Sequence, residues 1–524
     1  MNVSLEMAKS LYAGRAMDQV DDWHKLCRYL YRLHSTWSGQ GPVASNVYSS
    51  AGNGVHRIKV DEKEGIVITS HSLGGIKVSD LETDTLLWEL SSGYVRAWAH
   101  VEYGNGFLIF DRFGEYKEVW RLATHMGTEA CTNACAPDVL QSGHSDFAEQ
   151  RNPSSDLRGH FKPWALLRSP EWGRAFRFVY PTLLVGSFSK AYLFDVESGS
   201  LVQTVENTQQ VDGVPLGEIH YVEVSDQHVF ICGSVELRAF NRTDGRLAFR
   251  MSPDEIPDMT QLRAGGLRRV SYPRTRCAEV QPIPLTLDEE ISRTLRYFIA
   301  VHVCGEDLAI LRDDAEVIFI RNYKTAFQKK QPMTNFAVKI RIRDSAYSVD
   351  SVRAVYMAFE HGRLATAGVF VFTLDETIHS TSNSSSRNDE HPTLWSQPLA
   401  IVCCRVRSLE NRTVLNQVSC LQMTESKLFL AHHPLYAPLN TQDEGPKPAS
   451  ASPKTDELAE EALPTEPDPI DEELEHVAND DVDDMLFADD DDDDWLDEDF
   501  DINAEDDDQW EPEVRSVVCI DFSP

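Results

Sequence analysis

The sequence predicts an all-β protein of the β-propeller type, and three observations lead to this fold. A phrase of apolar strand, polar turn and apolar strand recurs at 77–87 (KVSDLETDTLL), 192–201 (YLFDVESGSL) and 238–247 (RAFNRTDGRL). The turns contain Asp, Asn, Ser, Thr and Gly, the residues that tight turns between antiparallel strands favour. The chain also ends in a strand-like segment, 516–522 (SVVCIDF). Repeated small antiparallel sheets bury their faces by stacking in a ring, and a terminal strand can close that ring.

Residues 1–42 predict a short helical segment. Asp21 or Asp22 can cap a helix that runs towards Gly39. Its apolar and aromatic positions recur at spacings of three and four, which place most of them on one face: Trp23, Leu26, Cys27, Leu30, Tyr31, Leu33 and then Trp37.

Residues 54–440 predict the propeller, with about seven blades and with six or eight as the alternatives. Strand patterns group at 55–90, 95–122, 161–206, 217–251, 295–325, 350–408 and 416–431. We expect polar inserts at 123–159 and 252–292, between neighbouring blades. The segment 514–524 is predicted to return to the last sheet, which would remove an exposed edge.

The net charge of −35 is concentrated in one segment. Residues 456–511 contain 29 Asp or Glu and no Lys or Arg, so the rest of the chain carries −35 + 29 = −6. We predict that the tract 441–513 is disordered, because its charges repel and cannot form a core. Two roles stay open for it: a solvating tail, or a tail that binds a basic protein through aromatic residues such as Trp495, Phe500 and Trp510.

Composition excludes several classes. No stretch approaches the roughly 20 apolar residues of a membrane span, and the first 20 residues lack the apolar core of a secretory signal. Ten scattered cysteines suit free thiols in the cytoplasm or nucleus. Nucleic acid is not an expected partner, because the acidic tract would compete for any basic surface. Two basic clusters are either docks for that tract or solvated loops: Arg263, Arg268, Arg269, Arg274 and Arg276, and Lys324, Lys329, Lys330, Lys339, Arg341 and Arg343.

No reliable catalytic or metal-binding pattern is present. The segment around Ser70-His71-Ser72 imitates the nucleophile elbow of hydrolases, but Ser70 stands where that motif needs Gly, and a strand pattern follows. Cys131 and Cys135 have the residue types of a zinc site without the usual spacing. We therefore expect no enzyme, no cofactor and no metal.

Two features resemble the F-box/WD-repeat proteins. The recurring phrase is similar to diverged WD repeats, although the Trp-Asp dipeptide and the Gly-His signature are missing. The segment 21–39 (DDWHKLCRYLYRLHSTWSG) resembles the end of an F-box and the linker that leads into a propeller. The Leu-Pro-x-Glu phrase that opens an F-box is absent from 1–20, so we expect the F-box to be truncated or missing.

The resemblance also implies where partners bind. In a WD-type propeller the turns between second and third strands form the top rim, which places His71, Arg112, Lys190 and Arg312 there. Such residues could bind an acidic or phosphorylated peptide. Trp23, Leu26, Leu30 and Trp37 would form the adaptor or linker helix.

Two functions follow as hypotheses. In the first, the protein is the substrate-recognition subunit of an SCF-type ubiquitin ligase, with a Skp-type adaptor and a cullin as partners. In the alternative, it is a stand-alone scaffold or chaperone-like propeller that binds basic proteins through the acidic tract. Either would act as a monomer through protein contacts, without a membrane.

Overall fold

We analysed the protein in a computed structural model. It describes residues 4–9, 12, 15–112, 115–127, 135–153, 156–252, 260–264, 280–287, 297–312, 316–329, 337–342, 356–366, 370–374, 401–406, 418–432 and 516–524. The predicted acidic tract 441–513, with Trp495, Phe500 and Trp510, lies outside these residues, as does Cys131.

Three short helices form the N-terminal unit: α1 (Leu5–Lys9), η1 (Arg15–Gln19) and α2 (Trp23–Trp37). The Asp22 carboxylate accepts a hydrogen bond from the Lys25 backbone N–H at 2.7 Å, which caps α2. Gly39, with a φ of +73°, follows the last turn of the helix. Ala8, Met17, Val20 and Leu26 form the small core of this unit.

Seven sheets of four to six strands form most of the remaining described chain, each named here by its innermost strand. The four regular sheets are the β2 sheet, with β2 (Val55–Asp61), β3 (Ile66–His71), β4 (Ile76–Asp80) and β5 (Leu86–Leu90); the β6 sheet, with β6 (Val101–Gly104), β7 (Phe107–Asp111), β8 (Tyr116–Leu122) and β9 (Phe161–Arg168); the β10 sheet, with β10 (Gly173–Val179), β11 (Thr182–Ser187), β12 (Ala191–Asp195) and β13 (Ser200–Val205); and the β16 sheet, with β16 (Ile219–Val224), β17 (His228–Gly233), β18 (Leu237–Asn241) and β19 (Leu247–Met251).

The other three sheets combine strands from distant parts of the chain. They are the β23 sheet, with β23 (Phe298–Cys304), β24 (Asp307–Arg312), β25 (Glu316–Ile320), β26 (Ala337–Ile342), β20 (Thr260–Ala264) and β22 (Leu285–Leu287); the β27 sheet, with β27 (Met357–Glu360), β28 (Arg363–Thr366), β29 (Phe370–Leu374), β30 (Ile401–Val406) and β21 (Val280–Ile283); and the β31 sheet, with β31 (Cys420–Met423), β32 (Lys427–His432), β33 (Ser516–Asp521) and β1 (Ala44–Tyr48). A two-stranded hairpin, β14 (Gln210–Val211) and β15 (Val214–Pro215), and two helices, α3 (Val139–Arg151) and α4 (Tyr323–Lys329), complete the described elements.

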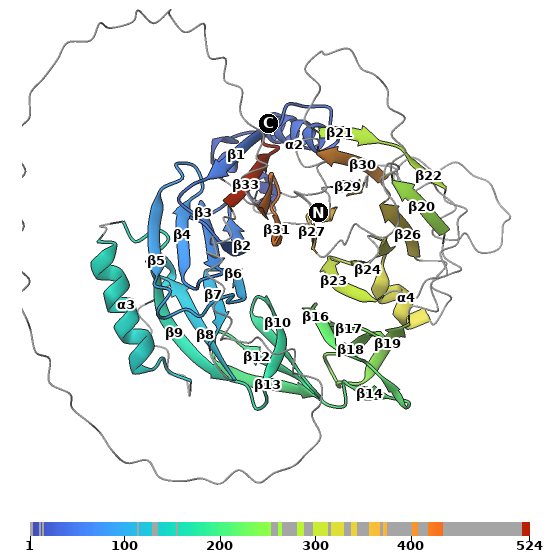
Figure 1. The fold of residues 1–524 in the computed structure, drawn as a ribbon. Helices are drawn as coiled ribbons and strands as arrows, with labels where there is room; N and C mark the ends of the chain where they lie inside the picture. Colours follow the sequence, from blue (N-terminus) through green and yellow to red (C-terminus); the bar gives the residue numbers. More distant parts are fainter. Residues whose placement is uncertain are drawn as a thin grey trace, which may run out of the picture. The chain divides into compact units, whose positions relative to one another are not determined.

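The sheets stand in a ring. Their innermost strands contact one another in the order β2, β6, β10, β16, β23, β27, β31 and back to β2, and Figure 1 shows the sheets radiating around a common centre. The prediction of an all-β propeller with a short N-terminal helical segment is therefore confirmed.

Both ends of the chain share one sheet. The C-terminal strand β33 pairs antiparallel with β32 on one side and with β1 on the other, so Val518 lies opposite both Leu430 and Val47. Strands that are far apart in the sequence are thus hydrogen-bonded side by side, which leaves no break in the ring.

The insert at 123–159 lies within a sheet and not between two sheets. Strand β9 follows the insert but pairs with β8, so it is the outer strand of the β6 sheet. The expectation that a new blade begins at residue 161 was therefore wrong. Helix α3, which belongs to the insert, packs on β5 and β9 at the outer edge. An insert between two hydrogen-bonded strands leaves no sequence pattern that separates it from an insert between blades.

Parts of the second insert and of the basic clusters also belong to a sheet. Strand β20 runs parallel to β26 and adds to the β23 sheet. Lys339 and Arg341 lie on β26 and are buried, so the expectation of solvated loops was wrong for these two residues. The cluster members Arg268, Arg269, Arg274, Arg276, Lys330 and Arg343 lie outside the described residues.

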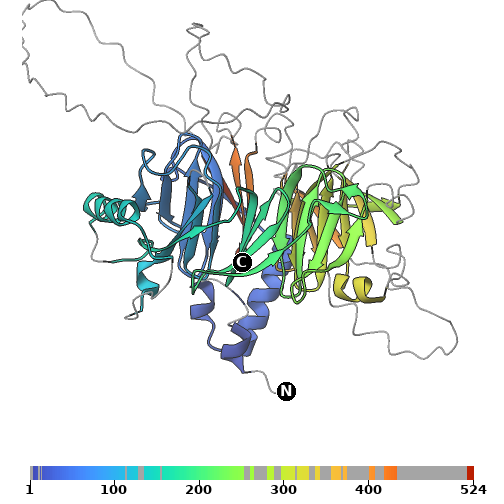
Figure 2. The same cartoon turned by 90° about the horizontal axis from the view of Figure 1, so that it is seen from below.

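Two faces of the ring can now be distinguished. The top face carries the turns between second and third strands, such as His71–Ile76, and the bottom face carries the Asp-containing turns of the recurring phrase. Helix α2 lies against the bottom face, because the Trp37 indole N–H donates to the Glu425 carbonyl in the β31–β32 turn. Figure 2 shows the N-terminal helices projecting from one side of the ring.

In the described part of the chain, no helix is long and apolar enough to cross a membrane.

Candidate partner-binding cavity

A cavity of about 800 Å³ opens at the top of the ring, where the first halves of the innermost strands converge. Strands β2, β10, β16, β23 and β31 each contribute their opening residues to its wall. The connections before β6 and β10 add Trp98 and Trp172 at its mouth. The ring places one short stretch from each sheet around a shared centre, so the cavity belongs to the fold as a whole.

The wall of the cavity is basic, although the protein as a whole is strongly acidic. Its lining holds seven cationic side chains and four carboxylates, a formal balance of 7 − 4 = +3. The cations are Arg57, Lys59, Arg96, Arg112, Lys117, Arg174 and Arg177, and the carboxylates are Glu102, Asp111, Glu218 and Glu360. A net positive concave surface attracts anionic groups.

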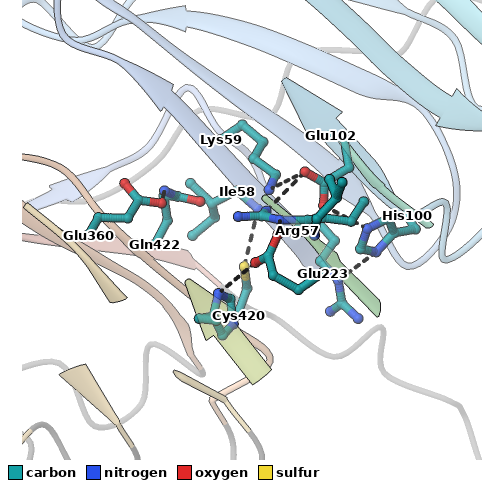
Figure 3. A network of polar contacts seen from close by, with 12 residues as sticks. Arg57, Ile58, Lys59, His100, Glu102, Glu223, Glu360, Cys420 and Gln422 are labelled. Atoms are coloured by element: carbon teal, nitrogen blue, oxygen red, sulfur yellow. Dashed lines mark hydrogen bonds and ion pairs between the residues drawn. The ribbon is translucent and has the colours of Figure 1, made fainter. Parts of the chain in front are cut away.

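An ion network connects four neighbouring sheets at the inner wall. Glu102 on β6 accepts from Lys59 on β2 at 3.0 Å and from Arg177 on β10 at 3.1 Å. Arg177 also donates from Nε to Glu223 on β16 at 3.2 Å. Figure 3 shows Lys59, Glu102 and Glu223 converging from separate strands. These contacts fix the spacing of the strands that shape the cavity.

The carboxylates of this network differ in their pKa. Burial alone would raise the pKa of Glu102, but the charges of Lys59 and Arg177 outweigh it and hold that pKa well below its usual range. Burial raises the pKa of Glu223, and Arg177 offsets this only in part. Glu102 is therefore the ionised centre of the network.

Two partly buried histidines flank the network. His100 Nε2 lies 3.0 Å from Glu102 Oε1, and burial lowers the pKa of His100 to about 4. His302 Nδ1 lies 3.6 Å from Glu223 Oε2, and burial lowers the pKa of His302 to about 3. Both imidazoles are neutral at pH 7, so they contribute hydrogen-bonding groups to the wall without charge.

The opposite wall is formed by β27 and β31. Gln422 donates to Glu360 at 3.3 Å, and Arg57 reaches across the β2–β31 boundary to donate to the Ser419 carbonyl at 3.0 Å. The Arg57 guanidinium lies 5.8 Å from the centroid of the Tyr356 ring. Figure 3 shows Arg57 and Gln422 on the two sides of this boundary.

Exposed aromatic side chains stand at the mouth of the cavity. Trp172, in the β9–β10 connection, is 64% exposed, and Phe188, in the β11–β12 turn, is 65% exposed. The Arg174 guanidinium lies 5.4 Å from the Trp172 ring centroid and 5.7 Å from that of Phe188. Exposed aromatic rings combined with arginine are typical of the central residues of protein-binding surfaces.

The four predicted rim residues have different surroundings. Arg112 lines the cavity and pairs with Glu118 at 3.2 Å and Asp138 at 2.7 Å. His71 is buried, and its Nδ1 lies 3.1 Å from the Asn53 carbonyl. Lys190 pairs with Glu206 at 3.3 Å, and Arg312 is buried against Glu316 at 2.6 Å. The structure brings only Arg112 of these four to the cavity, and a role in partner binding stays a prediction for all four.

The four residues predicted for the adaptor or linker helix differ in their exposure. Leu26 and Trp37 are buried, and Leu30 packs beside the core of the N-terminal unit. Trp23 is 48% exposed at the start of α2. Trp23 is therefore the member of this set that an adaptor could contact directly.

Sequence reasoning missed Lys59, Glu102, Arg177 and Glu223. The signal that could have found them is a single charged residue inside an otherwise apolar strand, as in Val101-Glu102-Tyr103 and Val222-Glu223-Val224. Nothing in the sequence shows that these isolated charges meet one another.

The motif around Ser70 has a structural explanation. Ser70 lies on strand β3, is buried, and donates from Oγ to the Ala99 carbonyl at 2.7 Å. Among the described residues, no group of three or more His, Cys, Asp or Glu side chains is arranged to hold a metal ion.

Comparison with known proteins gave structural similarity alone. No protein-family model and no curated protein sequence matches the chain. Among solved structures, the computationally designed Ika8 protein covers 72% of this chain and 93% of its own length at 11% identity and a TM-score of 0.38. U3-55K covers 74% of this chain and 92% of its own length at 9% identity and a TM-score of 0.41. Raptor of Chaetomium thermophilum covers 73% of this chain and 27% of its own length at 8% identity and a TM-score of 0.39. At these values the similarities say nothing about what this chain binds.

Proposed function

We propose that this protein is a protein-interaction propeller whose top cavity binds an acidic or phosphorylated segment of a partner. The observation that supports this most is the basic cavity of about 800 Å³ beneath exposed Trp172 and Phe188. Aromatic rings supply apolar contact area at such a mouth, and the cations supply selectivity for anionic groups.

We further propose that the chain is the substrate-recognition subunit of an SCF-type ubiquitin ligase. The resemblance of residues 21–39 to an F-box linker motivates this role. The structure is compatible with it, because α2 lies against the bottom face and leaves the cavity on the top face uncovered by the helices. A Skp-type adaptor at the helices and a client at the cavity would then bind at the same time. Eight cysteines of the described residues are free thiols, which suits the cytoplasm or nucleus.

Co-purification of partners with the chain tests both the cavity as the client site and the ubiquitin-ligase role. Arg174→Glu should lose the client and keep a Skp-type adaptor and cullin, whereas Trp23→Ala should weaken the adaptor and keep the client. Arg246→Glu is the matched control, because Arg246 is an exposed arginine in a bottom turn. Absence of adaptor and cullin from every preparation would refute the ligase role, and a client that survives Arg174→Glu would refute the cavity as its site.

The acidic tract supports a second candidate function. Its 29 acidic residues and interspersed aromatic residues suit a scaffold or chaperone-like propeller that holds basic proteins. Deletion of 456–511 should then release those clients, while Arg174→Glu should leave them bound. The opposite pattern would favour the cavity as the binding site.

A further inference from the structure

Lys117 is a buried lysine whose side chain lines the cavity. It is the second residue of β8 and is only 4% exposed. Its Nζ lies 5.1 Å from the centroid of the Phe176 ring on β10. It also lies beside Gly173, where an added Cβ would be 3.8 Å away. The amine is thus held between two neighbouring sheets, at the edge of the open space.

No carboxylate of the described residues forms an ion pair with Lys117. Asp111 is its register partner across β7 and β8, but each oxygen of Asp111 accepts a hydrogen bond from another group. Oδ1 accepts from the His100 backbone N–H at 2.9 Å, and Oδ2 accepts from Arg96. Other cations of the wall do have partners: Lys59 pairs with Glu102, for example, and Arg112 with Glu118 and Asp138.

A buried cation without a counterion is costly, because burial removes the water that would otherwise stabilise its charge. This loss, together with the nearby charge of Arg96, lowers the pKa of Lys117 to about 8. At pH 7 the amine is still mostly protonated. An anion that entered the cavity would restore the missing counterion without first breaking an ion pair.

Arg174 extends the same positive region to the mouth. It directly follows Gly173 in the chain, and it also forms no ion pair with a carboxylate among the residues that the structure describes. Its guanidinium is positioned by Trp172 and Phe188. An anionic group passing between these rings would meet Arg174 first and Lys117 deeper in the cavity.

We propose that Lys117 is the anchor of an oxyanion-binding subsite on the β6–β10 side of the cavity. The subsite takes one carboxylate or phosphate group, and Arg174 guides that group from the mouth. The inference rests on the proposed function, since it names the chemical group that the cavity selects. Charge-assisted hydrogen bonds from an amine and a guanidinium suit both kinds of oxyanion.

The test measures binding of three small probes to the full-length chain: inorganic phosphate, N-acetyl-phosphoserine amide and N-acetyl-glutamate amide. These probes separate a free phosphate from a phosphorylated side chain and from an acidic side chain. Lysine labelled with ¹³C at Cε reports on the Lys117 amine by NMR. We expect at least one probe to saturate and to raise the pKa of Lys117. We expect Lys117→Met to weaken that probe roughly tenfold to a hundredfold, as the loss of a charged hydrogen-bond donor implies.

Lys63→Met is the matched control, because Lys63 is an exposed lysine of the β2–β3 turn and does not line the cavity. It should bind the probes as the wild type does. Equal weakening in both variants would show a general charge effect and would overturn the subsite, as would a lack of saturation by every probe. If Lys117→Met does not fold, the wild-type protein is acetylated with and without the saturating probe. The probe should protect Lys117, and an unchanged acetylation of Lys117 refutes the subsite. If the probes do not bind but Arg174→Glu still loses the client, the subsite is refuted and the proposed function is not.

Discussion

The indole of Trp37 stacks face to face on the ring of Phe522, with centroids 3.6 Å apart and planes 9° from parallel. Trp37 is the last residue of α2, and Phe522 directly follows the last strand of the chain. The indole N–H donates to the Glu425 carbonyl at 3.0 Å, and the Arg363 guanidinium lies 5.0 Å from the ring centroid. One side chain thus joins the N-terminal helix, the C-terminus and the bottom turns of two sheets.

Trp37→Ala should therefore destabilise the protein. Trp37 is completely buried, so truncation leaves a large cavity and removes the indole N–H that donates to the Glu425 carbonyl. The expected loss is about 3–5 kcal/mol of unfolding free energy, measured by urea denaturation. Trp37→Phe should lose less, because it keeps the stacked ring. Trp23→Ala, on the exposed start of the same helix, is the control and should change stability by about 1 kcal/mol or less. Equal losses for Trp37→Ala and Trp23→Ala would contradict the proposed contact.

Glu62 should be important for joining the first and last sheets. Its carboxylate is buried and accepts from the Ser426 hydroxyl at 2.8 Å, the Ser426 N–H at 3.3 Å and the Thr424 hydroxyl. Glu62→Ala leaves the Ser426 hydroxyl and N–H without this acceptor, at a cost of at least about 2 kcal/mol. Glu206→Ala removes an exposed carboxylate of a surface pair and should cost less than about 1 kcal/mol. If hydrogen exchange of the β31–β32 turn were the same in Glu62→Ala as in wild type, this role would be wrong.

Arg177 should be the most sensitive member of the cavity network. Arg177→Met leaves Glu102 and Glu223 as buried neighbouring carboxylates, with an expected loss of about 3–5 kcal/mol in urea denaturation. Adding Glu223→Gln should recover part of this loss, because it removes the carboxylate that loses its arginine partner, whereas Glu102 keeps Lys59. Arg250→Met, which breaks an exposed pair with Asp212, is the control. Strictly additive effects of Arg177→Met and Glu223→Gln would show that the two residues are not coupled.

The sequence was sufficient for the recurring turns of the β2, β10 and β16 sheets, because the hydrogen bonds of those turns are local. Asp80 Oδ1 accepts from the Glu82 and Thr83 backbone N–H groups at 2.8 and 2.6 Å, and Asp195 Oδ1 accepts from that of Ser198 at 2.8 Å. Such hydrogen bonds link residues two or three apart, so the recurring phrase identifies them directly.

The cavity could not be predicted in the same way. Lys59, Glu102, Arg177 and Glu223 come from four different sheets and meet only after the ring has closed. The predicted rim residues Lys190 and Arg312 were chosen by their place in a turn, but in the structure they pair with Glu206 and Glu316 and do not line the cavity. Pairing of side chains across sheets, which decides which cations remain available, has no local sequence signal.

Acidification should destabilise the protein between about pH 6.5 and pH 4. The pKa values of His302 and His100 fall from 6.5 to about 3 and about 4 in the folded chain, so in this range the unfolded chain binds protons that the folded chain does not. Unfolding free energy therefore decreases as the pH falls. Burial raises the pKa of Glu223 and Glu360, and these two groups act in the opposite direction just above pH 4.5. The histidines dominate at the upper end of the range, near pH 6.

His302→Asn isolates one of these groups. In the unfolded chain His302 takes up a proton in this pH range. In the folded chain burial and the charges of Arg177 and Lys59 keep it unprotonated. The substitution removes this difference in bound protons. The slope of unfolding free energy against pH should decrease by about 1.4 kcal/mol per pH unit between pH 5 and pH 6, measured by urea titrations at constant ionic strength. A slope identical to that of the wild type would mean that His302 is protonated in the folded protein. The assignment of His302 as a neutral group of the cavity wall would then be wrong, because it would add a further cation near Arg177.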